Sequence, residues 1–146
     1  MIVPPPLFYL AALAIGIGLN ELVPVALPPG RWRFVIGLVL AVIAAAVVVS
    51  VLVSFSRAGT AFDLRKKPTA LVAHGPFRFS RHPSYLSLTF TYIAAGLMLG
   101  NGWVLLLTVP ALLVTDRWIV PKEEARLEAV FGERYRHYKS AVHRWL

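Results

Sequence analysis

The sequence predicts an all-α, polytopic membrane helix bundle with four spanning helices and a C-terminal amphipathic helix on the cytoplasmic side. Its 146 residues are 58% hydrophobic and 15% charged, and the mean hydropathy is +0.67. An ordinary soluble domain is about 45–50% apolar and about 25% charged. The apolar residues lie in long runs, as in membrane spans, and the cationic residues gather between and after these runs. The length fits one domain over residues 1–146.

Four apolar runs approach the length of roughly 20 residues that crosses a hydrocarbon core of about 30 Å. We expect spans at about 7–27, 34–55, 85–99 and 103–120. The first run contains an acid, Glu21, near its far end and close to Pro24. An acid within a span is functional by default, but this position favours a structural role at the interface.

The distribution of cations predicts the orientation. With four spans, both termini and the loop 56–82 share one side of the membrane. Twelve Lys and Arg residues lie in that loop and the tail, namely Arg57, Arg65, Lys66, Lys67, Arg78, Arg81, Lys122, Arg126, Arg134, Arg136, Lys139 and Arg144. The opposite side carries only Arg31 and Arg33. The positive-inside rule therefore makes loop and termini cytoplasmic, and we expect an integral protein of a bacterial or archaeal type of inner membrane.

The net charge of +8 indicates binding to lipid headgroups and anionic small molecules rather than to nucleic acid, because so much of the chain is apolar. The N-terminal residues MIVPPPLF lack the positive region of a signal peptide, so we expect the first run to be retained. The chain has no cysteine, and its four histidines show no metal-ligand spacing. A catalytic metal is therefore not expected.

The tail 121–143 is predicted as an amphipathic helix that Gly132 kinks or divides. Pro121 suits a first helical position, and Glu123 and Glu124 suit the positive end of the helix dipole. The loop 69–85 carries the other polar groups. Arg81 and His82 suit an anion, backbone N–H groups around Gly75 suit a carboxylate, and the rings of Phe77 and Tyr85 suit a heterocycle or a cation. Together the loop and the tail predict a zwitterionic ligand with a heterocycle.

Two stretches resemble a known family. GPFRFSRHPSYLS (75–87) resembles the GPYRYxRHPxYxG signature of the isoprenylcysteine carboxyl methyltransferase and phospholipid methyltransferase superfamily. KEEARLEAVFGERYRHYKSAVHRW (122–145) is similar to the tail of that family, EExxLxxxFGxxYxxYxxxVxRW. The resemblance covers about half of the chain. It implies an integral membrane enzyme that uses S-adenosylmethionine, bound on the cytosolic side by the loop, the last spans and the tail.

The resemblance also implies roles for single residues. The implied cofactor-binding residues are Leu71, Val72, Phe77, His82, Pro83, Ser84, Tyr85 and Glu123, and the backbone at Gly75 joins them. We expect Arg81 to handle a carboxylate of the substrate or of the cofactor, and Glu124, or a water on it, to accept a proton from an amine acceptor. Ile119 stands where eukaryotic isoprenylcysteine enzymes have a substrate-binding Arg. Arg117 and Arg126 are the candidate substitutes.

The function that the resemblance implies is methyl transfer to a lipid or small hydrophobic acceptor that offers a carboxylate, an amine or a thiol. A sulfonium methyl group is already activated, so the protein has mainly to align the reactants and exclude water. We expect the acceptor to enter from the bilayer. Two alternatives remain open: a membrane reductase of the sterol-reductase type that uses NADPH, and a non-catalytic membrane module with the same fold.

Overall fold

The computed structural model describes residues 5–60 and 68–146, and these residues are mostly helical. The helices are α1 (Pro5–Leu22), α2 (Arg31–Arg57), α3 (Pro83–Leu99), α4 (Gly102–Val114), α5 (Val120–Phe131) and α6 (Glu133–Ala141). A 3-10 turn, η1 (Gly75–Arg78), precedes α3, and a π-helical turn, η2 (Thr115–Ile119), joins α4 to α5. The prediction of an all-α fold is confirmed for these residues. Arg65, Lys66 and Lys67 of the predicted cytoplasmic loop lie outside the described residues.

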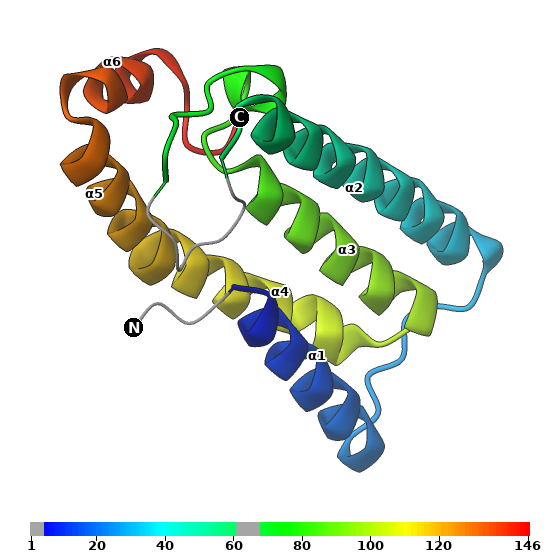
Figure 1. The fold of residues 1–146 in the computed structure, drawn as a ribbon. Coiled ribbons are helices and arrows are strands. Elements are labelled where there is room, and N and C mark those ends of the chain that lie inside the picture. Colours follow the sequence, from blue (N-terminus) through cyan, green and yellow to red (C-terminus); the bar gives the residue numbers. More distant parts are fainter. Residues whose placement is uncertain (1–4, 61–67) are drawn as a thin grey trace.

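Three helical segments in the described part of the chain are long and apolar enough to cross a membrane: α1, α2 and the continuous segment Gly102–Phe131. The helix α3, with 17 residues, is apolar but shorter. In Figure 1, α3 runs between α2 on one side and α4 with α1 on the other. The described residues therefore form a helix bundle with three candidate membrane spans, and α3 occupies its centre.

The first helix ends earlier than the predicted span 7–27. α1 stops at Leu22, and the Asn20 side chain accepts a hydrogen bond from the Val25 N–H at 3.0 Å. Pro24 has no N–H to donate to a further helical turn. The chain instead pairs with the turn between α3 and α4, where Ala26 and Asn101 form an isolated β-bridge. The last five residues of the predicted span thus form a connection.

The sequence predicts that the tail helix begins at Pro121. In the structure the helix instead continues from α4 through the π-helical turn η2 into α5. Val120 N–H donates to the Thr115 carbonyl, five residues earlier. A proline ring collides with the carbonyl four residues before it in a regular helix, and the wider π turn relieves this contact. Gly132, with φ of 53°, then divides the tail into α5 and α6.

Small residues allow the helices to approach closely. At Gly16 of α1, a Cβ atom would lie 2.9 Å from Val104 Cγ2 of α4. The buried residues Tyr9, Tyr92, Val104 and Ala111 form one core cluster between α1, α3 and α4. A hydrogen bond of 2.8 Å from the Ser87 hydroxyl to the Ala44 carbonyl joins α3 to α2. These contacts fix the bundle beneath the loop.

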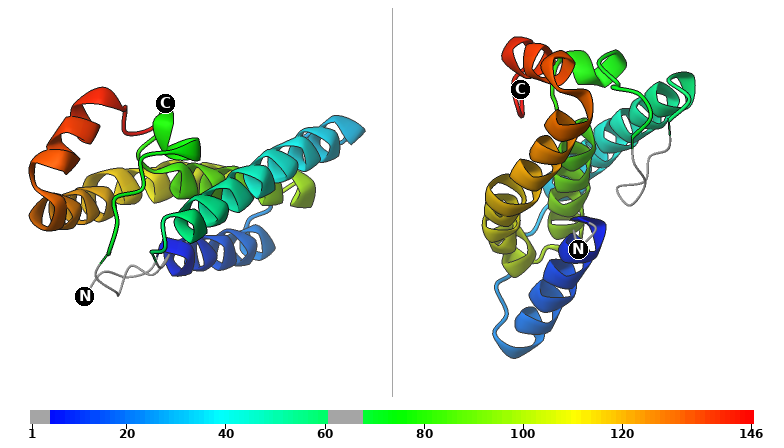
Figure 2. Two further views of the ribbon diagram at one scale, coloured as in Figure 1. Left: turned by 45° about the horizontal axis from the view of Figure 1, so that its top comes forward. Right: turned by 60° about the vertical axis from the view of Figure 1, so that its left-hand side comes forward.

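A second cluster lies at the other end of the bundle. It consists of Val51, Val72, Phe77, Tyr135 and Tyr138, all buried. These residues come from α2, from the segment around η1, and from α6, so the cluster packs the C-terminal helix onto the loop. Both views in Figure 2 show α6, the C-terminal end and η1 together at this end of the bundle. This packing places the loop and the tail next to each other.

Candidate functional site

The loop is fixed from both sides before it enters α3. Gly75 has φ of 63°, and a Cβ atom there would lie 2.5 Å from the Ser54 hydroxyl oxygen, so a larger residue would strain the backbone and displace the Ser54 side chain. The Phe77 ring packs edge-on against Phe55 of α2, with centroids 5.6 Å apart. From the other side, the Tyr138 hydroxyl of α6 donates to the Phe77 carbonyl at 2.8 Å. The loop conformation therefore depends on α2 and α6 together.

The start of α3 presents a stacked pair of rings. His82 is buried, and its backbone N–H donates to the Ser80 hydroxyl at 3.1 Å. Pro83 occupies the first turn of α3, where its missing N–H leaves no bond unmade. The rings of His82 and Tyr85 are stacked, with centroids 5.4 Å apart and planes within 9°. This arrangement aims both rings at the first turn of α5.

Two adjacent acids of α5 meet this segment. The Tyr85 hydroxyl donates to Glu123 Oε2 at 2.5 Å, and His82 Nδ1 lies 3.8 Å from the same oxygen. Glu124 is 2% exposed and is surrounded by nitrogen atoms. Arg81 Nη2 lies 3.1 Å away, Arg144 Nη2 3.2 Å, His82 Nε2 3.4 Å and Lys139 Nζ 3.5 Å. The two acids thus join the loop, α5 and the tail.

Hydrogen bonds from the C-terminal residues connect the loop to the π-helical turn η2. The backbone N–H of Arg81 donates to the His143 carbonyl at 3.0 Å. Arg144 Nη1 lies 3.2 Å from Asp116 Oδ1, and the Trp145 indole donates to the same oxygen at 3.0 Å. The hydrogen bond from Arg144 to Glu124 raises the pKa of the guanidinium, with Asp116 as a further cause. Arg144 therefore links the acid of η2 to the acid of α5.

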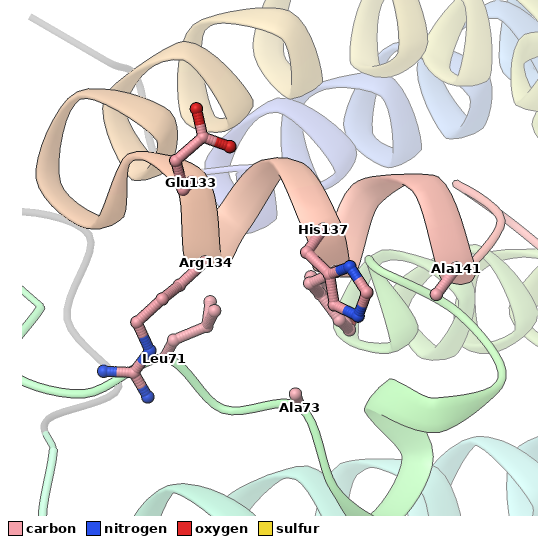
Figure 3. Close-up of a pocket in the computed structure, with 7 residues that line it drawn as sticks. Leu71, Ala73, Glu133, Arg134, His137 and Ala141 are labelled. Carbon is pink, nitrogen blue, oxygen red and sulfur yellow. The ribbon is translucent and has the colours of Figure 1, made fainter.

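An apolar hollow of about 520 Å³ lies between α6 and the segment that precedes η1, next to the core cluster that contains Tyr138. Its lining residues are Leu71, Ala73, Glu133, Arg134, His137, Tyr138 and Ala141. Figure 3 shows Arg134 and His137 extending from α6 toward the segment of Leu71 and Ala73, while Glu133 points away from it. The hollow is open, and most of its surface is apolar.

The structure brings Arg81, His82, Tyr85, Glu123 and Glu124 together, as the sequence predicts. Leu71 lines the hollow, while Val72 and Phe77 lie in the core cluster beside it. Pro83 is buried in the first turn of α3, and Ser84 is half-buried next to it. The roles of all these residues as ligand contacts stay predictions.

The two candidate substitute arginines differ in position. Arg117 is 75% exposed and pairs with Asp116 at 3.5 Å on the surface of η2, outside the group around Glu124. Arg126 is half-buried on α5. Ile119 lies in η2, also half-buried.

Sequence reasoning missed part of this cluster. It assigned no role in the site to Asp116, Lys139, Arg144 or Trp145. The signal for the last two was present, since they are the final Arg and Trp of the tail pattern that the sequence matches. In residues 5–60 and 68–146, no group of three or more His, Cys, Asp or Glu side chains is placed to hold a metal ion.

These features define a membrane helix bundle with a polar site built from one loop and the C-terminal helices. Residues 32–134 match the sequence model of the phospholipid methyltransferase family. The match covers more than half of the chain, so the chain belongs to this family of membrane methyltransferases, and the resemblance read from its motifs is confirmed. An uncharacterized protein of Haemophilus influenzae is 42% identical over 62 residues, which make up 42% of this chain and 98% of that protein. No solved structure matches the chain.

Proposed function

We propose that the chain transfers a methyl group from S-adenosylmethionine to a lipid or small hydrophobic acceptor at the cytoplasmic face of a membrane. One contact carries the proposal: the Tyr85 hydroxyl donates to Glu123 Oε2 at 2.5 Å. It joins the two stretches of sequence that resemble the methyltransferase superfamily, at the end of a bundle whose family is phospholipid methyltransferase.

The residues at this site fit a zwitterionic nucleotide. The Glu123 carboxylate is a suitable acceptor for an ammonium group or for ribose hydroxyls. Arg81 Nε is buried and has no hydrogen-bond acceptor among the described residues, so it can donate to a carboxylate. The apolar hollow beside Leu71 suits a flat heterocycle. The side-chain set therefore offers a partner to each part of the proposed cofactor.

The proposed reaction requires these residues mainly to position the reactants. S-adenosylmethionine, when bound, supplies a methyl group that its sulfonium charge has already activated. Tyr85, held by Glu123 and stacked on His82, presents a rigid wall to the ligand. Both oxygens of Glu124 are engaged by nitrogen atoms, which supports a role in holding the loop against the tail. Its role as a proton acceptor stays a prediction.

We further propose that α3 also crosses the membrane, which brings the number of spans to four, and that α6 lies at the cytoplasmic surface. At about 1.5 Å per residue, 17 residues reach about 26 Å, close to the hydrocarbon thickness of about 30 Å. The polar side chains of α3 are compatible with this, because Ser87, Thr89 and Thr91 each donate to a backbone carbonyl. The cations of the loop and tail favour the cytoplasmic side.

The absence of cysteine from the chain makes the topology directly testable. Single cysteines at the exposed positions Ser56, Ser140 and Pro29 would be labelled in intact bacterial cells with a membrane-impermeant maleimide. We expect Pro29→Cys to react at once, and Ser56→Cys and Ser140→Cys only after permeabilisation. Labelling of Ser140→Cys but not of Pro29→Cys before permeabilisation would refute the proposed orientation.

The activity is tested by isothermal titration of the purified protein with S-adenosylhomocysteine, followed by transfer of a tritiated methyl group from S-adenosylmethionine into a lipid extract. We expect saturable binding that NADPH does not compete away, and label in one lipid-soluble product. NADPH binding would favour the reductase, and cofactor binding without label in any extract would favour a non-catalytic module. A folded protein that binds no S-adenosylhomocysteine would overturn the proposal.

A further inference from the structure

Tyr135 of α6 carries a buried hydroxyl group that has no hydrogen-bond partner among the described residues. The residue is 1% exposed and belongs to the core cluster with Val51, Val72, Phe77 and Tyr138. A buried donor without a partner is costly, and native structures rarely keep one unless water or a ligand satisfies it. The neighbouring Tyr138 shows the ordinary solution, because its hydroxyl donates to the Phe77 carbonyl at 2.8 Å.

Charged residues of the candidate site influence the Tyr135 hydroxyl. Burial raises the pKa of Tyr135, the charge of Glu124 raises it further, and the charge of Arg81 lowers it. One turn further along the same face of α6, Lys139 Nζ lies 3.5 Å from Glu124 Oε2, and the Lys139 carbonyl accepts a hydrogen bond from Arg81 Nη1 at 3.4 Å. This face of α6 therefore lies against the acid and the arginine at which the loop and the tail meet. Tyr135 belongs to α6, the C-terminal helix that Gly132 separates from α5.

A second unpartnered donor lies in the same surroundings. Arg81 Nε is buried and has no acceptor in the part of the chain that the structure describes, although the Nη2 atom of the same side chain pairs with Glu124 at 3.1 Å. The Arg81 side chain is 9% exposed. An arginine N–H cannot accept a hydrogen bond, and a phenol at neutral pH is a good donor. Two donors without acceptors beside one acid are complementary to an oxygen atom that carries negative charge.

We propose that the Tyr135 hydroxyl donates a hydrogen bond to a carboxylate or phosphate oxygen of the bound ligand, together with Arg81 Nε. The inference rests on the proposed function, since it adds a ligand contact to the same site. The oxygen belongs either to the amino-acid part of the cofactor or to the headgroup of an anionic acceptor. Both sources share the chemistry of an oxyanion.

The test compares Tyr135→Phe with two matched variants. Tyr92→Phe also removes a buried hydroxyl that has no partner within residues 5–60 and 68–146, but from the core cluster around Tyr9. Tyr138→Phe removes the bonded hydroxyl next to Tyr135. We expect Tyr135→Phe and Tyr92→Phe to keep or slightly raise the melting temperature, because each removes an unsatisfied polar group, and Tyr138→Phe to lower it.

Two binding arms then distinguish the sources of the oxyanion. In the first arm, Tyr135→Phe is titrated with S-adenosylhomocysteine and with 5′-methylthioadenosine, which lacks the amino-acid part. In the second arm it is titrated with dodecyl phosphate. We expect about tenfold weaker binding in one arm, from the loss of one hydrogen bond to a charged group. If the cofactor is the source, Tyr135→Phe should bind 5′-methylthioadenosine as tightly as the wild type does. In both arms Tyr92→Phe should bind every probe as the wild type does.

The outcomes separate the inference from the proposed function. If wild-type protein binds S-adenosylhomocysteine but Tyr135→Phe binds every probe unchanged, the inference is wrong and the proposed function stands; a water bound to the hydroxyl would give this result. A lowered melting temperature with unchanged affinities would assign Tyr135 a structural role and also overturn the inference. Absence of S-adenosylhomocysteine binding by the wild type would refute the proposed function, and the dodecyl phosphate arm would then decide the inference alone.

Discussion

Arg144 donates hydrogen bonds to Glu124 from two nitrogen atoms, although the two residues are 20 positions apart in the sequence. Nη2 lies 3.2 Å from Oε2, and Nε lies 3.4 Å from Oε1. The remaining Nη1 atom reaches Asp116 at 3.2 Å. A single guanidinium therefore connects the C-terminal end to both halves of the long helical segment Gly102–Phe131. The stability of the site therefore depends on this connection.

Replacing Glu124 with Gln should destabilise the protein strongly. The variant leaves the buried Arg81 without its carboxylate and weakens the contacts of Arg144 and Lys139. Breaking a buried ion pair costs about 3 kcal/mol or more in the free energy of unfolding. Denaturant unfolding in detergent micelles measures this loss. Glu128→Gln is the control, because Glu128 makes only longer contacts to Arg136 and Lys139 and should change stability by less than about 1 kcal/mol. Equal losses in the two variants would contradict the prediction.

Removing the Tyr85 hydroxyl or the charge of Glu123 should weaken cofactor binding. We expect Tyr85→Phe and Glu123→Gln each to reduce the affinity for S-adenosylhomocysteine by about ten- to a hundredfold, since each loses a hydrogen bond to a charged group. The double variant should lose less than the product of the two factors, because both changes remove the same bond. Glu128→Gln is the control, at an acid of the same helix whose carboxylate lies 3.8 Å from Arg136 Nη1 and does not line the hollow. Independent effects of the two changes would argue against the contact.

Asp116→Asn should release the C-terminal end. The change keeps the size of the side chain but removes the charge that holds Arg144 and the Trp145 indole. We expect carboxypeptidase to digest the variant several times faster than the wild type, because local opening exposes the chain end. Arg117→Gln removes the exposed partner of the same carboxylate and should leave digestion unchanged. If the two variants behave alike, Asp116 does not hold the C-terminal end.

Gly132→Ala should destabilise the junction of α5 and α6. Gly132 has φ of 53° and ψ of −125°, and no atom lies within 4 Å of where a Cβ would sit. The cost is therefore backbone strain alone, about 1–3 kcal/mol, because this pair of angles lies outside the regions that residues with a Cβ atom adopt. Gly18→Ala is a matched control, since Gly18 also has open space but lies inside α1, where alanine should stabilise by about 0.5–1 kcal/mol. Thermal unfolding of both variants, with opposite shifts expected, checks this.

The packing of α6 should weaken at high pH. Burial raises the pKa of Tyr138 to about 12, although the charge of Arg81 lowers it. Because the folded protein holds this proton more tightly than the unfolded chain, the contribution of Tyr138 to stability is complete below about pH 10 and is lost as the pH rises through 12. The stability difference between wild type and Tyr138→Phe should therefore shrink between about pH 10 and 12. A difference that stays constant over this range would contradict the assignment.

Much of the candidate site could be predicted because its residues lie in two short patterns. The order Arg81, His82, Pro83, Tyr85 and the pair Glu123 and Glu124 are local features, and the structure brings them together. Asp116 could not be placed in the same way. Nothing local distinguishes an acid at a membrane interface from one that holds Arg144, because its partner is 28 residues away. The end of α1 and the join of α4 to α5 were also misplaced, since each depends on a distant turn or on a π-helical adjustment.

The sequence by itself determined where apolar helices form, where cations gather and which two stretches carry polar chemistry. Hydropathy and helix-ending residues act over a few neighbouring positions, so these properties can be read along the chain. The tertiary structure alone decided that Arg144 joins Asp116 to Glu124, and that the Tyr135 hydroxyl has no partner among the residues that the structure describes. Such pairings depend on how α5 and α6 pack across the loop, and that packing is fixed by contacts between residues far apart in the chain.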